Sequence, residues 1–359
     1  MQFPGQGKPP VGVIYDADIG ASIDSTLALA LLYGFDGKND VRVISVSVSR
    51  NNLNAAAFSD VVARFYAGVV SGQFGGFGRT LPVGLNDNGR KAADTPMVTL
   101  TLAKQTAEGK PVYDHGIHKL NDTADPAPLI RNALTAQYDQ NAIVVLAGPA
   151  TDLAKVLDLP GVKELIAHKV RFLSFAGGSY PDGPPEPNIL ADIPAARKLF
   201  AEWPTPIVAS GREVGAALLY PAESIEKDFA WSPAHPVADA YRAYKPMPYD
   251  APTWAMTSVL YAARPQEGYF KLSDPGTIRV LDDGRVKFSA SAEGTHRYLI
   301  LDPAQHERII KAYREVASAK PVVRQFRFRK KDAEADAKTP DVKQPEAKPP
   351  EAKQPEVKP

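Results

Sequence analysis

The sequence predicts an α/β fold in which a mainly parallel central sheet is flanked by helices, and three observations support this prediction. Strand-like and helix-like segments alternate along residues 11–211, as in repeated βαβ units. The strand-like segments are nearly continuous apolar runs, which is typical of parallel strands buried on both faces. The chain has 359 residues, of which 44% are hydrophobic, so one large domain can bury a sizeable core.

Each element follows from its local pattern. Short apolar runs bounded by polar or glycine residues predict strands at 11–18, 41–49, 141–148, 169–178 and 205–211. Longer segments rich in alanine and leucine predict helices at 24–35, 55–68, 150–159 and 193–203. Ligands of such folds bind at the C-terminal ends of the strands. The loops that follow Asp16, Ala147 and Gly177 are expected to emerge together at that edge.

The C-terminus differs from the rest of the chain. From Lys343 it reads KQPEAKPPEAKQPEVKP, with lysine and glutamate recurring every five residues. Proline and charge dominate, and such a segment cannot bury enough apolar surface to offset its ordering entropy. We therefore predict a folded domain at residues 8–325 and a disordered tail at 330–359, which serves as a solubilising segment, a spacer or a docking peptide. The preceding VVRQFRFRKK favours a solvated edge strand over a binding patch.

Composition excludes several classes of function. The formal net charge of +1 gives no support for a nucleic-acid partner. The chain has no cysteine, which excludes disulfides, zinc–thiolate sites and cysteine nucleophiles. No apolar run approaches the roughly 18 residues of a membrane span. The first residues lack an apolar signal segment, which fits a cytoplasmic start or an exported chain with a trimmed signal, so the compartment stays open.

Three aspartates crowd the segment IYDADIGASIDSTLALALL, residues 14–32. Asp16 and Asp18 follow a strand and are two residues apart, so their side chains share a face and can offer two carboxylates to a divalent ion. Gly20 allows a sharp turn after them. Asp24 stands at the start of the next helix, where aspartate is also a preferred N-cap. The segment therefore indicates either a metal-binding loop or a well-capped helix.

This loop resembles the N-terminal signature of the inosine/uridine-preferring nucleoside hydrolase family, in which a strand and an acidic D-x-D-x-G loop precede an apolar helix. DADIGASIDSTLAL is similar to a longer form of that signature. VVLAGPATDLAKVL resembles the strand–GPLTNLA–helix segment of the family, and FAGGSYPDGPPEPNILADIPAARKLF is similar to its ribose-binding region. PIVASGREVG and TWAMTSVLYAARP resemble a later strand and helix. The resemblance runs from about Val11 to Pro321.

The resemblance implies hydrolysis of the N-glycosidic bond of ribonucleosides to ribose and free base, assisted by calcium (Ca2+). It makes Asp18 the general base and a calcium ligand, with Asp24 and the Ala147 carbonyl as further ligands. The partner is a small nucleoside or ribose, and the family commonly forms dimers and tetramers, which leaves a homo-oligomer open. The residues that it places on the substrate side are Asp16, which supports the loop, Glu186 and Asn188, which bind ribose, and Trp254, which lies beside the base.

The sequence departs from the family pattern at the metal. Ser25 replaces the second acid at the helix start, and Ser22 replaces another acid of the longer signature. Ala255 stands where the late metal-binding aspartate belongs, and Asp250 lies five residues upstream of it. Because calcium affinity depends on the number of charged ligands, the site is expected to be weakened. Three outcomes stay open: an active hydrolase, an inactive relative that binds a nucleoside or sugar, and a scaffold without a ligand.

Other motifs do not predict a site. His115 and His118 have the spacing of a helical metal pair, but the surrounding residues favour a solvated loop. The glycine-rich segment 71–79 lacks the Lys-Ser/Thr of a phosphate-binding loop, so a flexible loop is expected. ASGREVG lacks the G-x-S-x-G order of a serine hydrolase elbow.

Overall fold

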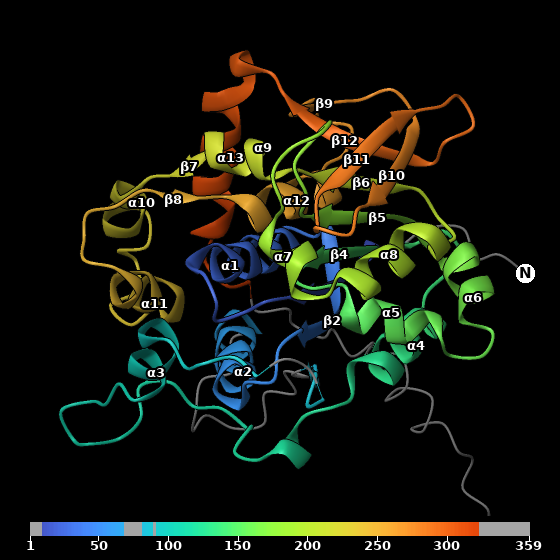
Figure 1. The fold of residues 1–359 in the computed structure, drawn as a ribbon. Coiled ribbons are helices and arrows are strands. Elements are labelled where there is room, and N and C mark those ends of the chain that lie inside the picture. Colours follow the sequence, from blue (N-terminus) through green and yellow to red (C-terminus); the bar gives the residue numbers. More distant parts are fainter. Residues whose placement is uncertain (1–8, 68–80, 89–90, 323–359) are drawn as a thin grey trace, which may run out of the picture. The chain divides into compact units, whose positions relative to one another are not determined.

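A ten-stranded sheet organises residues 9–67, 81–88 and 91–322, which are the residues described by the computed structural model (Figure 1). The strand order is β11-β10-β12-β6-β5-β4-β1-β2-β3, and β9 pairs with β12. The strands are β1 (Val11–Ala17), β2 (Val41–Val48), β3 (Val83–Leu85), β4 (Ala142–Ala147), β5 (Val170–Ala176), β6 (Ile207–Ser210), β9 (Phe270–Leu272), β10 (Gly276–Val280), β11 (Val286–Ala290) and β12 (His296–Leu301).

The sheet is mainly parallel, as the apolar runs predict. The strands from β6 through β5, β4, β1 and β2 to β3 are all parallel neighbours, and β12 also runs parallel to β6. All five strands expected between residues 11 and 211 are present. The antiparallel strands β9, β10 and β11 at one edge were not expected, because β10 alternates buried and exposed residues and β11 is mostly exposed, so neither forms an apolar run.

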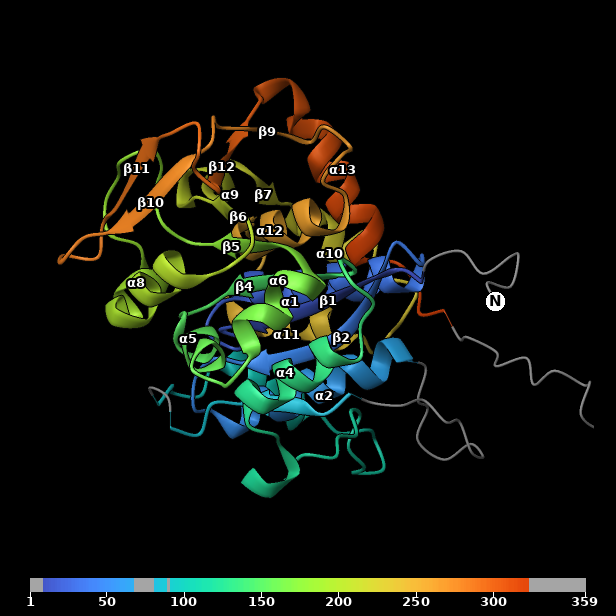
Figure 2. The ribbon, with the colours of Figure 1, turned by 90° about the vertical axis from the view of Figure 1, so that its right-hand side faces the viewer.

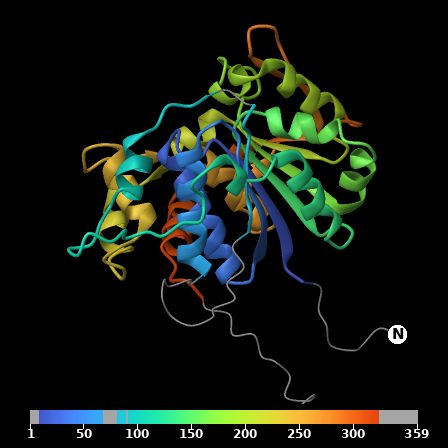
Figure 3. The same ribbon diagram turned by 90° about the horizontal axis from the view of Figure 1, so that it is seen from below.

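Helices cover both faces of the sheet (Figure 2). One face packs on α4 (Pro126–Thr135), α5 (Thr151–Leu157), α6 (Val162–Lys169) and α8 (Ile193–Glu202). The opposite face packs on α1 (Ile23–Gly37), α2 (Leu53–Ala67) and α12 (Trp254–Ala263), and α11 (Pro236–Tyr244) and α13 (His306–Ala317) pack on α1. Figure 3 shows the two helix layers on either side of the strands. The remaining elements are α3 (Pro96–Leu102), α7 (Pro187–Ala191), α9 (Arg212–Ala217), α10 (Ala222–Lys227) and the strand pair β7 (Leu219–Tyr220) and β8 (Ala251–Pro252).

Helix α1 is buried almost throughout, because the sheet, α12 and α13 all pack against it. Its sequence is accordingly apolar on every side rather than amphipathic. Gly34 lets α13 approach closely, since a Cβ atom there would lie 2.0 Å from the carbonyl oxygen of Val316. The rigid packing of α1 fixes the position of the acidic loop that precedes it.

Three sequence predictions fall outside the described residues. They concern the tail at 330–359, the part of the basic segment that follows Val322, and the glycine-rich segment at 71–79. The compact unit to which all described residues belong runs to Val322. Among the described helices, none has the length and apolar character needed to cross a bilayer.

Candidate ligand pocket

A pocket of about 230 Å³ opens at the C-terminal ends of the parallel strands, where the loop positions predicted it. The loops after β1, β2, β4, β5 and β6 contribute to it, together with the start of α12. Its lining residues are Asp18, Ala21, Ser22, Asp24, Ser25, Arg50, Ala147, Ala176, Gly177, Glu186, Pro187, Asn188, Ser210, Arg212, Trp254 and Ala255.

Two glycines shape the acidic loop. Gly20 has a φ of +94°, so it makes the sharp turn that the sequence predicted. Gly148 permits close packing of two loops, since a Cβ atom there would lie 2.8 Å from the amide nitrogen of Asp18. That amide donates a hydrogen bond of 3.2 Å to the carbonyl of Ala147. The loops after β1 and β4 are therefore held together beneath the pocket.

Asp18 is paired with an arginine. Its Oδ2 atom lies 2.7 Å from Nη2 of Arg50, and the side chains of Asp18 and Arg50 are 11% and 22% exposed. Burial raises the pKa of Asp18 to about 6, although the guanidinium of Arg50 acts in the opposite direction. The negative charge of the predicted general base is thus balanced by a side chain of the same protein.

Asp24 joins α1 to α12. Its Oδ2 atom accepts a hydrogen bond of 2.6 Å from the amide of Ala255, and Oδ1 accepts one of 3.3 Å from the amide of Met256. These amides belong to the first turn of α12, so Asp24 caps a helix 231 residues away rather than its own. Burial raises its pKa to about 7, and the two amides lower it.

Ser25 and Ala255 stand where the family pattern has acids, and neither offers a free polar side-chain group. Ser25 Oγ lies 3.1 Å from the carbonyl oxygen of Asp18 and 3.0 Å from that of Ser22, so its proton is shared between two backbone acceptors. Ala255 is 3% exposed and offers only a methyl group. Neither residue replaces the acid that the family resemblance expects.

The residues present do not fit a calcium ion. Calcium takes six to eight oxygen ligands and depends on carboxylates among them. One Asp18 oxygen is paired with a guanidinium, and both Asp24 oxygens accept amide hydrogens. Within the part of the chain that the structure describes, no three His, Cys, Asp or Glu side chains are grouped to hold a metal ion. Asp18, Asp24 and Ala147 do come together, but not as the metal shell that the sequence predicted.

Glu186 and Asn188 also line the pocket. Glu186 is the N-cap of α7, and its Oε2 atom accepts hydrogen bonds from the amides of Asn188, Ile189 and Gly178. Burial raises the pKa of Glu186, and these amides lower it. The side-chain amide of Asn188 donates to the carbonyl of Ala176 at 2.9 Å. Both side chains are therefore preorganised on the pocket wall.

Trp254 and Arg212 also line the pocket and contact each other. The indole Nε1 of Trp254 donates to the carbonyl of Arg212 at 3.1 Å, which fixes the ring. The guanidinium carbon of Arg212 lies 6.0 Å from the ring centroid, at the outer limit of a cation–π contact. Half-buried Trp254 thus presents a planar apolar surface to the pocket, and its role beside the base, which the family resemblance implies, stays a prediction.

Asp16 is not part of the pocket. It is fully buried on the face of the sheet covered by α4 and α5, and neither carboxylate oxygen has a hydrogen-bond partner among the described residues. Burial, together with the nearby acid Asp152, raises its pKa well above the usual range. Because Asp16 has no exposed surface, it cannot contact a ligand in this structure, and the prediction that placed it on the substrate side is not retained.

Arg50 and Arg212 line the pocket but were not predicted from the sequence. Each stands two residues after a parallel strand, β2 and β6, and that position was the available signal. Asp250, the acid upstream of Ala255, accepts a hydrogen bond from the amide of Ala222 and does not line the pocket. His115 and His118 lie in a loop, as expected, with ring centroids 4.8 Å apart.

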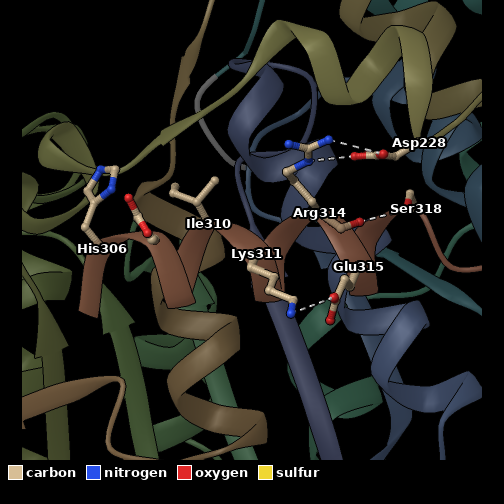
Figure 4. Close-up of a pocket in the computed structure, with 8 residues that line it drawn as sticks. Asp228, His306, Ile310, Lys311, Arg314, Glu315 and Ser318 are labelled. Carbon is tan, nitrogen blue, oxygen red and sulfur yellow. Dashed lines mark hydrogen bonds and ion pairs between the residues drawn. The ribbon is translucent and has the colours of Figure 1, made fainter. Parts of the chain in front are cut away.

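A larger, open cavity of about 600 Å³ lies along α13 (Figure 4). Four of its charged side chains form ion pairs, Arg314 with Asp228 and Lys311 with Glu315. The hydrogen bond from Arg314 lowers the pKa of Asp228, and no Phe, Tyr or Trp lines this cavity. The pocket at the strand ends, where buried acids converge, is therefore the candidate functional site.

Comparisons with known proteins identify a family and a shared fold. The model of the inosine-uridine preferring nucleoside hydrolase family matches residues 13–325. No curated protein sequence matches the chain. Similar solved structures include an inosine-uridine preferring nucleoside hydrolase from Bacillus anthracis, with 16% identity, a TM-score of 0.61, and coverage of 86% of this chain and 99% of that one.

Two further structures share the fold. A plant nucleoside hydrolase is 18% identical, with a TM-score of 0.60 and coverage of 87% of this chain and 100% of that one. A purine-preferring ribonucleoside hydrolase from Gardnerella vaginalis is 16% identical, with a TM-score of 0.60 and coverage of 86% and 99%. The family model spans most of the chain, and the described fold matches that of solved nucleoside hydrolases. The chain therefore belongs to the inosine-uridine preferring nucleoside hydrolase family.

Proposed function

We propose that this protein binds the ribosyl part of a nucleoside in the pocket at the strand ends, and that it does so without a calcium ion. The observation that carries the proposal is the Asp18–Arg50 ion pair, which balances the acidic loop from within the protein. Family membership supports a nucleoside as the ligand. The geometry thus favours the nucleoside-binding alternative over calcium-assisted hydrolysis.

The charges of the pocket suit an uncharged ligand. Asp18 is offset by Arg50, and Arg212 lies close enough to Glu186 to lower its pKa. Preorganised polar groups beside a planar apolar wall are the usual composition of a small-molecule site. We expect Asn188 and Glu186 to contact the sugar and Trp254 to stack on the base.

A second candidate is calcium-independent hydrolysis of the same ligand. Burial places the pKa of Asp18 at about 6, so its carboxylate is ionised and still basic near neutral pH. In this reaction Asp18 takes a proton from water, the water oxygen bonds to the anomeric carbon, and the base leaves with the electrons of the C–N bond and acquires a proton. Oδ1 of Asp18 makes no hydrogen bond within the described residues, which leaves it open to such a water.

One experiment separates these outcomes. Purine and pyrimidine nucleosides are titrated calorimetrically in EDTA, and release of reducing sugar is measured with and without millimolar calcium, with Asp18→Ala as control. Saturable binding without sugar release supports the binding protein, and calcium-independent release that is lost in Asp18→Ala supports the second candidate. Binding or release that requires calcium contradicts the calcium-free proposal. A folded protein that binds no nucleoside contradicts both candidates.

A further inference from the structure

We infer that the guanidinium of Arg50 is the resident cation of this pocket, and that Arg50 and Asp18 together select ligands with a vicinal diol. The inference deepens the proposed function and rests on it for the identity of the ligand. It assigns Arg50 a specificity-determining role, and it accounts for the loss of the acids that a metal ion would need.

The sheet brings the two side chains together. Strands β1 and β2 are parallel neighbours, with Ala17 opposite Val48. The loops that follow these paired residues therefore leave the sheet side by side, and Asp18 and Arg50 meet at 2.7 Å. Both residues line the pocket, so the ion pair faces the ligand rather than the core.

Arginine is suited to replace a metal ion permanently. Its guanidinium stays protonated at all relevant pH values, whereas a bound ion can be removed by a chelator. A divalent ion placed beside Asp18 would be repelled by this fixed positive charge. The other two acids of the pocket, Asp24 and Glu186, already accept hydrogen bonds from backbone amides.

The pair offers one donor and one acceptor side by side. Arginine carries five N–H donors, and the contact with Oδ2 of Asp18 uses Nη2. Oδ1 of Asp18 remains an acceptor. One hydroxyl of a vicinal diol can accept from the guanidinium while the other donates to Oδ1, an arrangement that a ligand lacking either hydroxyl cannot satisfy. Charge-assisted hydrogen bonds of this kind discriminate more strongly than neutral ones.

The cation assignment is tested first, without any nucleoside. Calcium and the luminescent probe Tb3+ are titrated into the full-length wild type, Arg50→Gln and the conservative Arg50→Lys. Arg64→Gln is the matched control, because Arg64 pairs with Asp60 at the same 2.7 Å and with similar exposure, outside the pocket. We expect an ion affinity about tenfold higher in Arg50→Gln than in the other three proteins. Equal affinities in all four, or sub-millimolar calcium binding by the wild type that Asp18→Ala abolishes, would overturn the assignment.

The diol is tested in EDTA with a ribonucleoside and its 2′-deoxy and 3′-deoxy analogues. We expect the wild type and Arg64→Gln to prefer the ribonucleoside about tenfold or more, and Arg50→Gln to lose that preference while keeping its fold by circular dichroism. A preference that survives in Arg50→Gln would refute the specificity role. If the wild type binds no nucleoside, the proposed function and the diol role both fail, and the ion titration still decides the cation assignment.

Discussion

Replacing Asp24 with alanine tests whether this acid is a structural cap. The substitution removes the acceptor of two buried amides, those of Ala255 and Met256. An unsatisfied buried N–H costs about 1–3 kcal/mol, so the two together cost about 2–6 kcal/mol. Part of this loss is offset, because burial of the carboxyl is itself unfavourable, as its raised pKa indicates, and the substitution removes it. We expect Asp24→Ala to lower the free energy of unfolding by about 2–4 kcal/mol, and Asp24→Asn, which keeps an acceptor, by less than half of that.

The assay is urea unfolding followed by circular dichroism at neutral pH, in EDTA and again in millimolar calcium. Asp250→Ala is the control, because Asp250 is exposed and accepts a single bond of 2.8 Å from the amide of Ala222. We expect about 0.5–1.5 kcal/mol for that variant. If Asp24→Ala costs no more than Asp250→Ala, or if calcium stabilises the wild type and not Asp24→Ala, then Asp24 is a ligand rather than a cap.

Three further predictions concern packing, pH and the ligand. A Cβ atom at Gly34 would lie 2.0 Å from a backbone oxygen of α13, so Gly34→Ala should lower the free energy of unfolding by about 2–3 kcal/mol and lower the melting temperature. Gly37→Ala should change neither, because the nearest atom to a Cβ there lies 3.5 Å away. Burial lowers the pKa of His235 from 6.5 to about 3. Between these two pH values the imidazole is protonated in the unfolded state and neutral in the folded state, so stability is lost as the pH falls from 6.5 to about 3. Between pH 7 and 4.5, the free energy of unfolding measured by urea titration should therefore fall by about 3 kcal/mol more in the wild type than in His235→Leu. Equal losses in the two proteins would contradict this. Trp254→Ala should weaken nucleoside binding about tenfold by calorimetry, and Trp254→Phe much less; equal affinities would remove the stacking role.

Much of the fold was predictable because its signals are local. The apolar run at 11–18 and the alanine- and leucine-rich run at 24–35 form β1 and α1, as hydrophobicity and spacing indicate. The strand order of the parallel region places those strand ends at one edge, so a pocket there was also expected. The antiparallel edge near β10 was not, since its short strands carry the weaker alternating pattern of a half-exposed sheet.

The family, the parallel sheet and the edge at which the pocket lies could all be predicted, because apolar periodicity and ordered motifs are read along the chain. The contacts of the acids could not be predicted, because they are made between distant parts of the chain. Whether Asp18 meets a metal ion or Arg50 depends on the register of β1 and β2, and whether Asp24 is free or a cap depends on a helix 231 residues away. A carboxylate has the same composition in every role, and its partner in space, rather than its neighbours in sequence, sets its charge balance and its chemistry.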